Sequence, residues 1–346
     1  MKRRARWILG LGGGAVLLAG AVVVVDFLRF LHGPMRPTAP QPLTLLVAPG
    51  SPVTRVAHDL AAEGWIERPL YFRIAARASG AARRIQAGEY RIPPGQTPQR
   101  LLERMVAGDV KTYTLTVIEG WTFDQMMAAV RNHAVLEQTL PADAAGSAVM
   151  EALGQPDEHP EGWFFPDTYQ FPRGTSDLDL LRRANERMQR VLEEEWAGRE
   201  EGLPLDSAYE ALILASIIER ETGVPEERAR IAGVFVERLE RGMRLQTDPT
   251  VIYGLGDEFD GDLRFRHLRT DTPYNTYTRA GLTPTPIALP SRAAIHAAVH
   301  PDRRGEVYFV ATGDGRHVFS KTLEEHNEAV IEYQLGGDAS RLRGRN

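Results

Sequence analysis

The chain has 346 residues, which is enough for two folded domains. Its composition, with 43% hydrophobic and 25% charged residues, is that of a globular protein with an ordinary core. Its formal net charge of −5 argues against nucleic acid as a partner. Cysteine is absent, which excludes disulfide bonds and thiolate chemistry without identifying a compartment.

The N-terminal segment predicts a membrane anchor. Four basic residues precede an uncharged stretch of 19 residues, 7–25, which as a helix would be about 28 Å long, close to the roughly 30 Å of a bilayer core. Because the positive charges precede the stretch, we expect a cytoplasmic tail over residues 1–6, a transmembrane helix over 7–28 and the remainder outside. Residues 19–21, Ala-Gly-Ala, resemble a signal-peptide cleavage site, so a cleaved leader is the alternative.

A linker and a small subdomain are expected next. Residues 29–42 are rich in proline and polar residues, which is typical of a linker. From Leu43 to Ile92 the pattern predicts a strand, two helices and a second strand, with glycine turns between them. This β-α-α-β order, within a subdomain over 43–112, resembles a LysM module, a fold associated with binding N-acetylglucosamine polymers. A plain α/β packing unit without a ligand is the alternative.

A larger domain is expected over residues 113–335, followed by a flexible tail over 336–346. Residues 176–195 predict a long amphipathic helix. The helix that begins with a Ser207–Glu210 capping box is apolar on nearly every face, so we expect it to be central and buried. The predicted fold class is therefore α+β: an N-terminal transmembrane helix, a LysM-like β-α-α-β subdomain, and a mixed α/β catalytic domain around one buried helix.

The motifs for common cofactor and metal chemistry are missing from the sequence. None of the nine histidines forms HExxH, so we expect no metal site, and no P-loop or G-x-S-x-G nucleophile elbow occurs. No cofactor is therefore predicted. Carboxylates are left as the candidate catalytic groups.

Glu219 is the main candidate for a catalytic acid. It follows an apolar run in the predicted buried helix and lies near the helix C-terminus. Burial and the helix dipole both favour its protonated form, which a general acid requires. A structural salt bridge to Arg238 or Arg244 is the alternative. Glu221 points about 200° away on the helical wheel, so we expect it to cap the helix or meet solvent.

Several long motifs occur in a fixed order along the chain. The stretches are AGEYRIPPGQ at 87–96, EGWFFPDTY at 161–169, ILASIIERETG at 213–223, GVFVERLERGMRLQTDPTVIYGLG at 233–256, TPYNTYTRAGLTPTPIALP at 272–290, AAVHP at 297–301 and YFVATGDGRHVFSKTLEEHN at 308–327. Together they resemble the endolytic murein transglycosylase family (MltG/YceG-like).

The resemblance implies a function in cell wall synthesis. Such proteins are anchored in the inner membrane with the bulk of the chain in the periplasm. They cleave nascent peptidoglycan glycan strands internally, between N-acetylmuramic acid and N-acetylglucosamine, and leave 1,6-anhydro-N-acetylmuramic acid ends. The catalytic Glu of the family matches Glu219, which would act first as acid and then as base. Glycan strands are the implied substrate and peptidoglycan synthases the implied protein partners.

Other residues of these motifs are candidates for sugar contacts. They are Gln246, Thr247, Asp248, Tyr274, Asn275, Tyr277 and Trp163. Turn formation and core packing are their alternative roles. His300 and His326 match the motifs without an assignable role.

Two other functions remain open. One is a muramidase-type hydrolase in which Asp248 or another acid activates water. The other is a non-catalytic scaffold that binds peptidoglycan through the LysM-like region.

Overall fold

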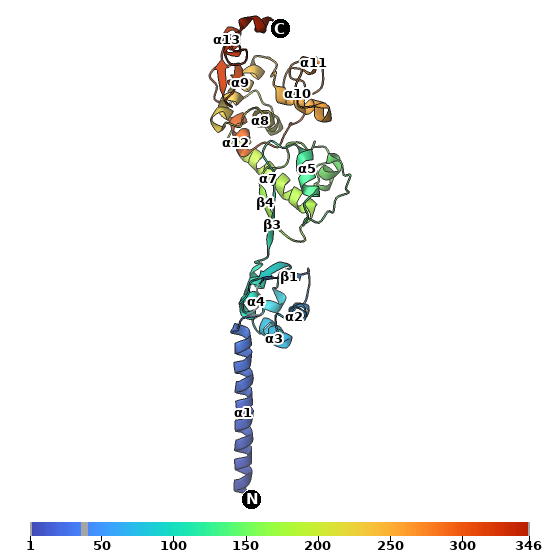
Figure 1. Ribbon diagram of the computed structural model, residues 1–346, viewed down its shortest axis with the longest axis vertical. Coiled ribbons are helices and arrows are strands. Elements are labelled where there is room, and N and C mark those ends of the chain that lie inside the picture. Colours follow the sequence, from blue (N-terminus) through green and yellow to red (C-terminus); the bar gives the residue numbers. More distant parts are fainter. Residues whose placement is uncertain (1, 36–40, 345–346) are drawn as a thin grey trace. The chain divides into compact units, whose positions relative to one another are not determined.

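The computed structural model describes residues 2–35 and 41–344, and the chain divides into two compact units (Figure 1). Unit 1 contains the chain up to Tyr113 together with Gln170–Gly174. Unit 2 contains Thr114–Tyr169 and the chain from Thr175 onward. The architecture is mixed α+β, with many helices and small two-stranded sheets.

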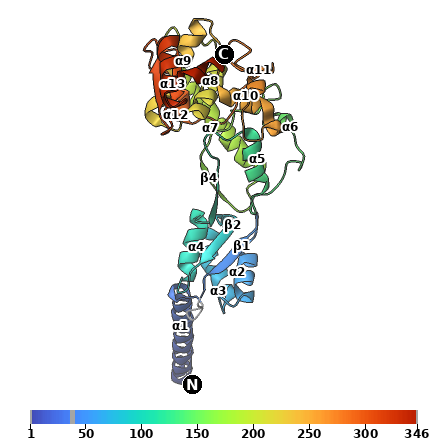
Figure 2. The same cartoon turned by 45° about the horizontal axis from the view of Figure 1, so that its top comes forward.

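Unit 1 is built on one antiparallel strand pair. Strands β1 (Leu43–Val47) and β2 (Gly88–Ile92) pair with Leu43 opposite Ile92. The helices of this unit are α1 (Lys2–His32), α2 (Val53–Ala62), α3 (Pro69–Ala78), η1 (Ala81–Arg83) and α4 (Pro98–Ala107), of which α2, α3 and α4 lie beside the strands (Figure 2). The order β1-α2-α3-β2 is the β-α-α-β order predicted from the sequence. Its likeness to LysM and any glycan binding there stay predictions.

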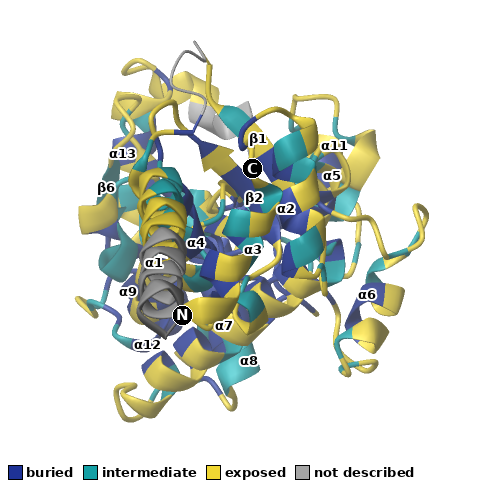
Figure 3. Cartoon of the chain, turned by 90° about the horizontal axis from the view of Figure 1, so that it is seen from below, coloured by how far each residue is buried: buried dark blue, intermediate teal, exposed yellow. Residues whose placement is uncertain are grey.

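The helices of unit 1 follow their apolar stripes. In α2 the four residues Val53, Val56, Ala57 and Leu60 are buried. Figure 3 shows buried and exposed residues alternating on α2 and α3. Each apolar side chain of Val or Leu size that is fully buried stabilises the fold by roughly 1.5–3 kcal/mol. The core of the subdomain is therefore formed by apolar residues that recur in the sequence at helical spacing.

A buried carboxylate completes unit 1. Glu89 is 3% exposed and accepts hydrogen bonds from Lys111 Nζ at 2.9 Å, Tyr113 Oη at 2.6 Å and Arg173 Nε at 2.7 Å. Burial alone would raise the pKa of Glu89, but these three donors and the charge of Lys111 lower it to about 2. The Glu89 carboxylate of β2 thus binds Tyr113 of β3 and the two cations that directly precede β3 and follow β4.

The predicted transmembrane anchor over residues 7–28 is not supported. The side chains of residues 7–16 lie outside the described part of the structure, and within the part described, no helix combines the length and apolar character needed to cross a bilayer. The apolar stretch with described side chains runs from Leu17 and is interrupted by Asp26. Helix α1 continues to His32, so the first residues of the predicted linker are helical, and residues 36–40 of that linker lie outside the described residues.

Unit 2 is mainly helical. Within it, β5 (Tyr308–Ala311) and β6 (His317–Ser320) form a small sheet, while β3 (Thr112–Thr116) and β4 (Thr168–Pro172), which form another, each belong partly to unit 1 and partly to unit 2. The helices are α5 (Phe123–Arg131), α6 (Gly146–Ala152), α7 (Asp177–Ala197), α8 (Ala208–Glu221), η2 (Pro225–Glu227), α9 (Arg228–Glu240), α10 (Asp248–Leu255), η3 (Gly256–Glu258), α11 (Phe265–Arg269), α12 (Arg292–Val299), α13 (Leu323–Tyr333) and η4 (Ala339–Gly344). Residues 345–346 of the predicted tail lie outside the described residues.

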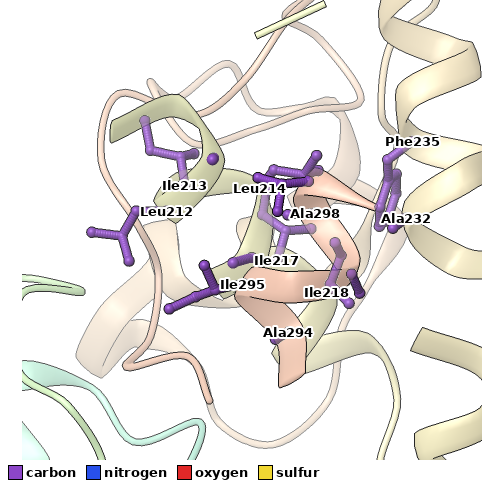
Figure 4. Close-up of a cluster of buried hydrophobic side chains, with 14 of the residues drawn as sticks. Leu212, Ile213, Leu214, Ile217, Ile218, Ala232, Phe235, Ala294, Ile295 and Ala298 are labelled. Carbon is purple, nitrogen blue, oxygen red and sulfur yellow. The ribbon is translucent and has the colours of Figure 1, made fainter. Parts of the chain in front are cut away.

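Helix α8 is the centre of unit 2, as the sequence predicts. Its residues from Ala211 to Ile218 are all buried, and α7, α9, α10 and α12 pack around it. Figure 4 shows Leu214, Ile217 and Ile218 of α8 gathered with apolar residues of α9 and α12. Because every face of α8 meets another helix, its last turn is fixed within the packed interior. The two glutamates of that turn are therefore held in defined positions.

The start of α8 differs in one detail from the predicted capping box. Ser207 Oγ accepts from the backbone N–H of Glu210 at 3.3 Å, as expected of an N-cap. The Glu210 carboxylate accepts from the backbone N–H of Asp206 at 2.6 Å, one residue earlier than a capping box requires.

Candidate active site

The last turn of α8 holds two glutamates in different surroundings. Glu219 and Glu221 are two residues apart, so their side chains leave the helix in nearly opposite directions. Glu221 lines the cavity described below, and Glu219 contacts the N-terminal ends of two other helices.

Glu219 joins three segments of unit 2. Its Oε2 accepts from the backbone N–H of Ser291 at 3.0 Å and from Ser291 Oγ at 2.5 Å, and its Oε1 lies 3.8 Å from Arg228 at the start of α9. Ser291 is also the N-cap of α12, where its Oγ accepts from the Ala294 N–H at 3.2 Å. The side chain of Glu219 is 6% exposed. These contacts tie α8 to the first turns of α9 and α12.

The predicted alternative for Glu219 was a salt bridge to Arg238 or Arg244, but the structure pairs Glu219 with a different arginine. The Arg238 guanidinium donates to the carbonyls of Val307 at 2.6 Å and Leu245 at 2.7 Å. Arg244 donates to the carbonyl of Tyr277 at 3.1 Å. The cation beside Glu219 is Arg228, which the sequence places nine residues further along the chain.

Glu221 faces a cavity of about 560 Å³. Its Oε1 accepts a hydrogen bond from Thr247 Oγ1. Burial and the neighbouring charge of Asp248 raise the pKa of Glu221 to about 7, against the lowering effects of the Thr247 hydrogen bond and the Arg238 charge. At neutral pH a carboxyl with that pKa is present both as acid and as carboxylate, which suits proton transfer in either direction.

The expectation that Glu221 caps the helix or meets solvent is wrong. The chain turns sharply at Thr222, whose backbone is extended, and the segment 245–248 lies against the end of α8. This segment is remote in sequence and covers the direction that the helical wheel assigns to solvent. A wheel describes one helix and contains no information about what packs on it.

Four predicted sugar-contact residues line the same cavity as Glu221. They are Gln246, Thr247, Asp248 and Tyr277. Tyr277 Oη donates to Asp248 Oδ1 at 2.6 Å, which fixes the carboxylate of Asp248. The structure therefore brings together the LQTD and YNTY motifs, which are about thirty residues apart, around one carboxyl of α8.

The backbone at Gln246 is strained. It has φ = 51°, a left-handed conformation that a residue with a Cβ adopts at a cost of about 1–2 kcal/mol. Its N–H donates to the Thr276 carbonyl at 3.1 Å, which helps to hold this conformation. Residues held in such conformations are concentrated at functional sites, so Gln246 supports the assignment of the cavity.

The other predicted sugar-contact residues lie outside the lining of this cavity. Asn275 is fully buried, and its amide donates to the carbonyls of His267, Leu268 and Thr270, at 2.7 Å for Thr270. Tyr274 Oη is 2.9 Å from Thr285 Oγ1. Trp163 stacks on Tyr209 with ring centroids 5.7 Å apart. These contacts fit turn formation and core packing, and roles in sugar binding stay predictions.

His326 is a cavity residue without a role assigned from the sequence. Its ring stacks on Tyr308 with centroids 5.0 Å apart, and both residues line the cavity. Burial, and secondarily the Arg238 charge, lowers the pKa of His326, so the imidazole is neutral at neutral pH. Its Nδ1 is buried without a hydrogen-bond partner among the described residues. The EEHN motif could have suggested the position but not this setting.

Glu161 is a second carboxyl with a raised pKa that the sequence reasoning missed. It is 3% exposed and accepts from the Phe123 N–H at 2.9 Å and from Tyr253 Oη at 3.1 Å. Burial raises its pKa to about 7. Because Phe123 is the first residue of α5, Glu161 fastens the start of that helix and lies outside the lining of the Glu221 cavity.

Comparison with known proteins gives consistent matches over most of the chain. The sequence profile of the YceG-like family matches residues 45–332. The endolytic murein transglycosylase of Bacillus subtilis is 30% identical over 325 residues, which cover 88% of this chain and 89% of that protein. An endolytic murein transglycosylase of Streptococcus pneumoniae is 26% identical over 352 residues, which cover 92% of this chain and 63% of that longer protein.

A solved structure agrees with the sequence matches. The crystal structure of a YceG-like protein of Listeria monocytogenes superposes with a TM-score of 0.50 at 28% identity, over 84% of this chain and 99% of that one. The profile match covers well over half of the chain, and the Bacillus subtilis match covers most of both proteins. The chain belongs to the YceG-like family.

Proposed function

We propose that the protein is a lytic transglycosylase that cleaves peptidoglycan glycan strands internally, between N-acetylmuramic acid and N-acetylglucosamine, and leaves 1,6-anhydro-N-acetylmuramic acid ends. Two kinds of evidence support this proposal. The relatives from Bacillus subtilis and Streptococcus pneumoniae are both named endolytic murein transglycosylases. The cavity at the end of α8 combines a carboxyl poised near neutral pH with tyrosine, histidine and arginine side chains.

The observation that carries the proposal is the position of Glu221. Protonated, it donates its proton to the glycosidic oxygen of the departing N-acetylglucosamine as the bond to C1 breaks. As a carboxylate, it then accepts the proton of the muramic C6 hydroxyl, whose oxygen forms the new bond to C1. Water is not consumed, and the nucleophile belongs to the substrate, which raises its effective concentration.

The remaining cavity residues have supporting roles in this scheme. The carboxylate of Asp248, held by Tyr277, provides negative charge for the oxocarbenium-like transition state. Glu219, which the family resemblance assigns as the acid, accepts two hydrogen bonds from Ser291 at Oε2, and its Oε1 lies 3.8 Å from Arg228. In our proposal Glu219 is a positioning residue that fixes the last turn of α8, and Glu221 is the acid and base.

Paired substitutions distinguish the two glutamates. The full chain and its Glu221→Gln and Glu219→Gln variants are incubated with purified uncrosslinked glycan strands, and the ends formed are identified by mass spectrometry. We expect anhydro ends from the wild type, almost none from Glu221→Gln and a larger residual rate from Glu219→Gln. The opposite order of the two variants would restore Glu219 as the acid.

A hydrolase is the second candidate, and one observation favours it. Asp248 lies in the same cavity as Glu221, so the site holds two carboxylates, as hydrolytic glycosidases require. Products with reducing ends, each heavier by one water than the anhydro product, would establish hydrolysis.

The cellular setting is also a proposal. The charge pattern of the N-terminus and the family resemblance favour a location at the inner membrane, with the bulk of the chain in the periplasm and close to the synthases that polymerise glycan strands. Fractionation of cells, followed by protease treatment of spheroplasts, tests that location.

A further inference from the structure

A cluster of metal-binding side chains lies away from the cavity. Glu195 of α7, His296 of α12 and His300 at the C-terminal end of α12 each place one ligand atom so that all three lie within 4.8 Å of one another. Their side chains do not line the cavity at Glu221. The sequence alone does not indicate such a site, because Glu195 is about a hundred residues from the histidines.

We infer that Glu195, His296 and His300 form a binding site for one divalent transition metal ion of the zinc class. Two imidazoles and a carboxylate are a common ligand set for zinc, with a fourth position open to water. The ligand atoms of a tetrahedral zinc ion lie about 3.4 Å apart, given bonds of about 2.1 Å. Side-chain movements of about 1 Å therefore suffice to close the site.

The two histidines meet at the C-terminal end of α12. His296 belongs to its last turn and His300 is the C-cap residue, and their ring centroids lie 4.4 Å apart with ring planes 35° apart. His296 is 58% exposed and His300 29% exposed, so an ion can reach both rings from solvent. The arrangement needs no change in the backbone.

The carboxylate is fixed independently of the histidines. Glu195 is 9% exposed, and its Oε1 accepts from Arg292 Nε at 2.6 Å, while Oε2 lies 2.8 Å from His296 Nδ1. A metal-bound carboxylate is commonly held by such an outer hydrogen bond. In this site Arg292 orients Glu195 and leaves Oε2 for the ion.

A further carboxylate lies beside the cluster. Glu200, whose Oε1 is 4.0 Å from His300 Nδ1, offers a further oxygen ligand.

A bound ion would fasten α7 to α12. The first turn of α12 begins at Ser291, which holds Glu219 at the end of α8. The ion would therefore stiffen the frame of the catalytic domain without touching the substrate. Its effect should appear first in stability, because binding to the folded state alone raises the melting temperature.

Cobalt titration tests the site. The full chain is freed of metal with a chelator and titrated with Co²⁺, whose visible absorption bands report four-coordinate binding, and with Zn²⁺ in a thermal melt. We expect one equivalent bound by the wild type and a rise in melting temperature. The His296→Ala/His300→Ala double variant should bind at least about tenfold more weakly, since even changes outside the ligand shell cost 10–100-fold.

Two further variants control the result. His58→Ala removes an exposed histidine of unit 1 and should bind cobalt as the wild type does. Glu195→Gln retains the volume but removes the anionic ligand, and it should weaken binding; if it does not fold, the exposed histidine pair decides the test. Failure of the wild type to bind cobalt, or undiminished binding by the double variant, would overturn the inference.

Discussion

Replacing Glu221 by glutamine should make the protein slower and, in alkaline solution, more stable. Glutamine has nearly the same shape and its carbonyl oxygen can still accept from Thr247 Oγ1. It cannot release or take up a proton. Loss of a positioned general acid and base costs about 10²–10⁴ in rate, so we expect glycan cleavage to fall by that factor.

The stability change follows from the pKa of Glu221. Its folded value of about 7 lies above the ordinary value of 4.5, so folding favours the protonated form. That stabilisation is complete below about pH 4.5 and is lost as the pH rises through about 7. The difference of about 2.5 pKa units amounts to about 3 kcal/mol at high pH. Glutamine stays neutral and avoids this loss.

Urea unfolding of both proteins at about pH 4 and about pH 9 measures the effect. We expect nearly equal stability at the lower pH and a Glu221→Gln variant more stable by up to about 3 kcal/mol at the higher one. Glu161 contributes equally to both proteins and cancels. A stability difference that does not change with pH, or a variant with the wild-type cleavage rate, would refute the argument.

Three further substitutions test other parts of the structure. Ser291→Ala removes the N-cap of α12 and the hydroxyl donor to Glu219, so unfolding in urea should show a loss of about 2 kcal/mol. Tyr277→Phe frees Asp248, and steady-state kinetics should show kcat about tenfold lower, since one hydrogen bond of about 1.4 kcal/mol is lost. Glu89 has a folded pKa lowered to about 2, so it contributes stability above about pH 4.5 that is lost as the pH falls towards 2. Glu89→Gln should therefore cost about 2 kcal/mol at neutral pH, allowing for the exposure of its cations, and almost nothing near pH 2.

Helices with a strong hydrophobic pattern were predictable from the sequence. The apolar stripe of α2 and the uniformly apolar sequence of α8 indicate residues that form the cores of the two units, because burial of apolar area dominates the stability of both. Short elements were not. Helices α6, α10 and α11 are only one or two turns long and are set by tertiary contacts.

The candidate site was half predictable. The QTD motif and Tyr277 were selected from the resemblance, and the structure gathers them around one cavity. The choice between Glu219 and Glu221 depended on what covers each side of α8. That information lies in Ser291 and Thr247, which are remote in sequence. The role of Asn275 was not predictable for the same reason, because its buried amide donates to a backbone carbonyl of the preceding loop.

The left-handed backbone at Gln246 has a consequence for attempts to stabilise the enzyme. Glycine at this position would relieve about 1 kcal/mol of conformational cost, although its freedom in the unfolded chain offsets part of the gain. It would also delete the amide whose Oε1 lies 3.4 Å from Arg238. A Gln246→Gly variant with a higher melting temperature and a lower cleavage rate would show that this loop adopts an unfavourable backbone conformation in order to place an amide in the lining of the Glu221 cavity.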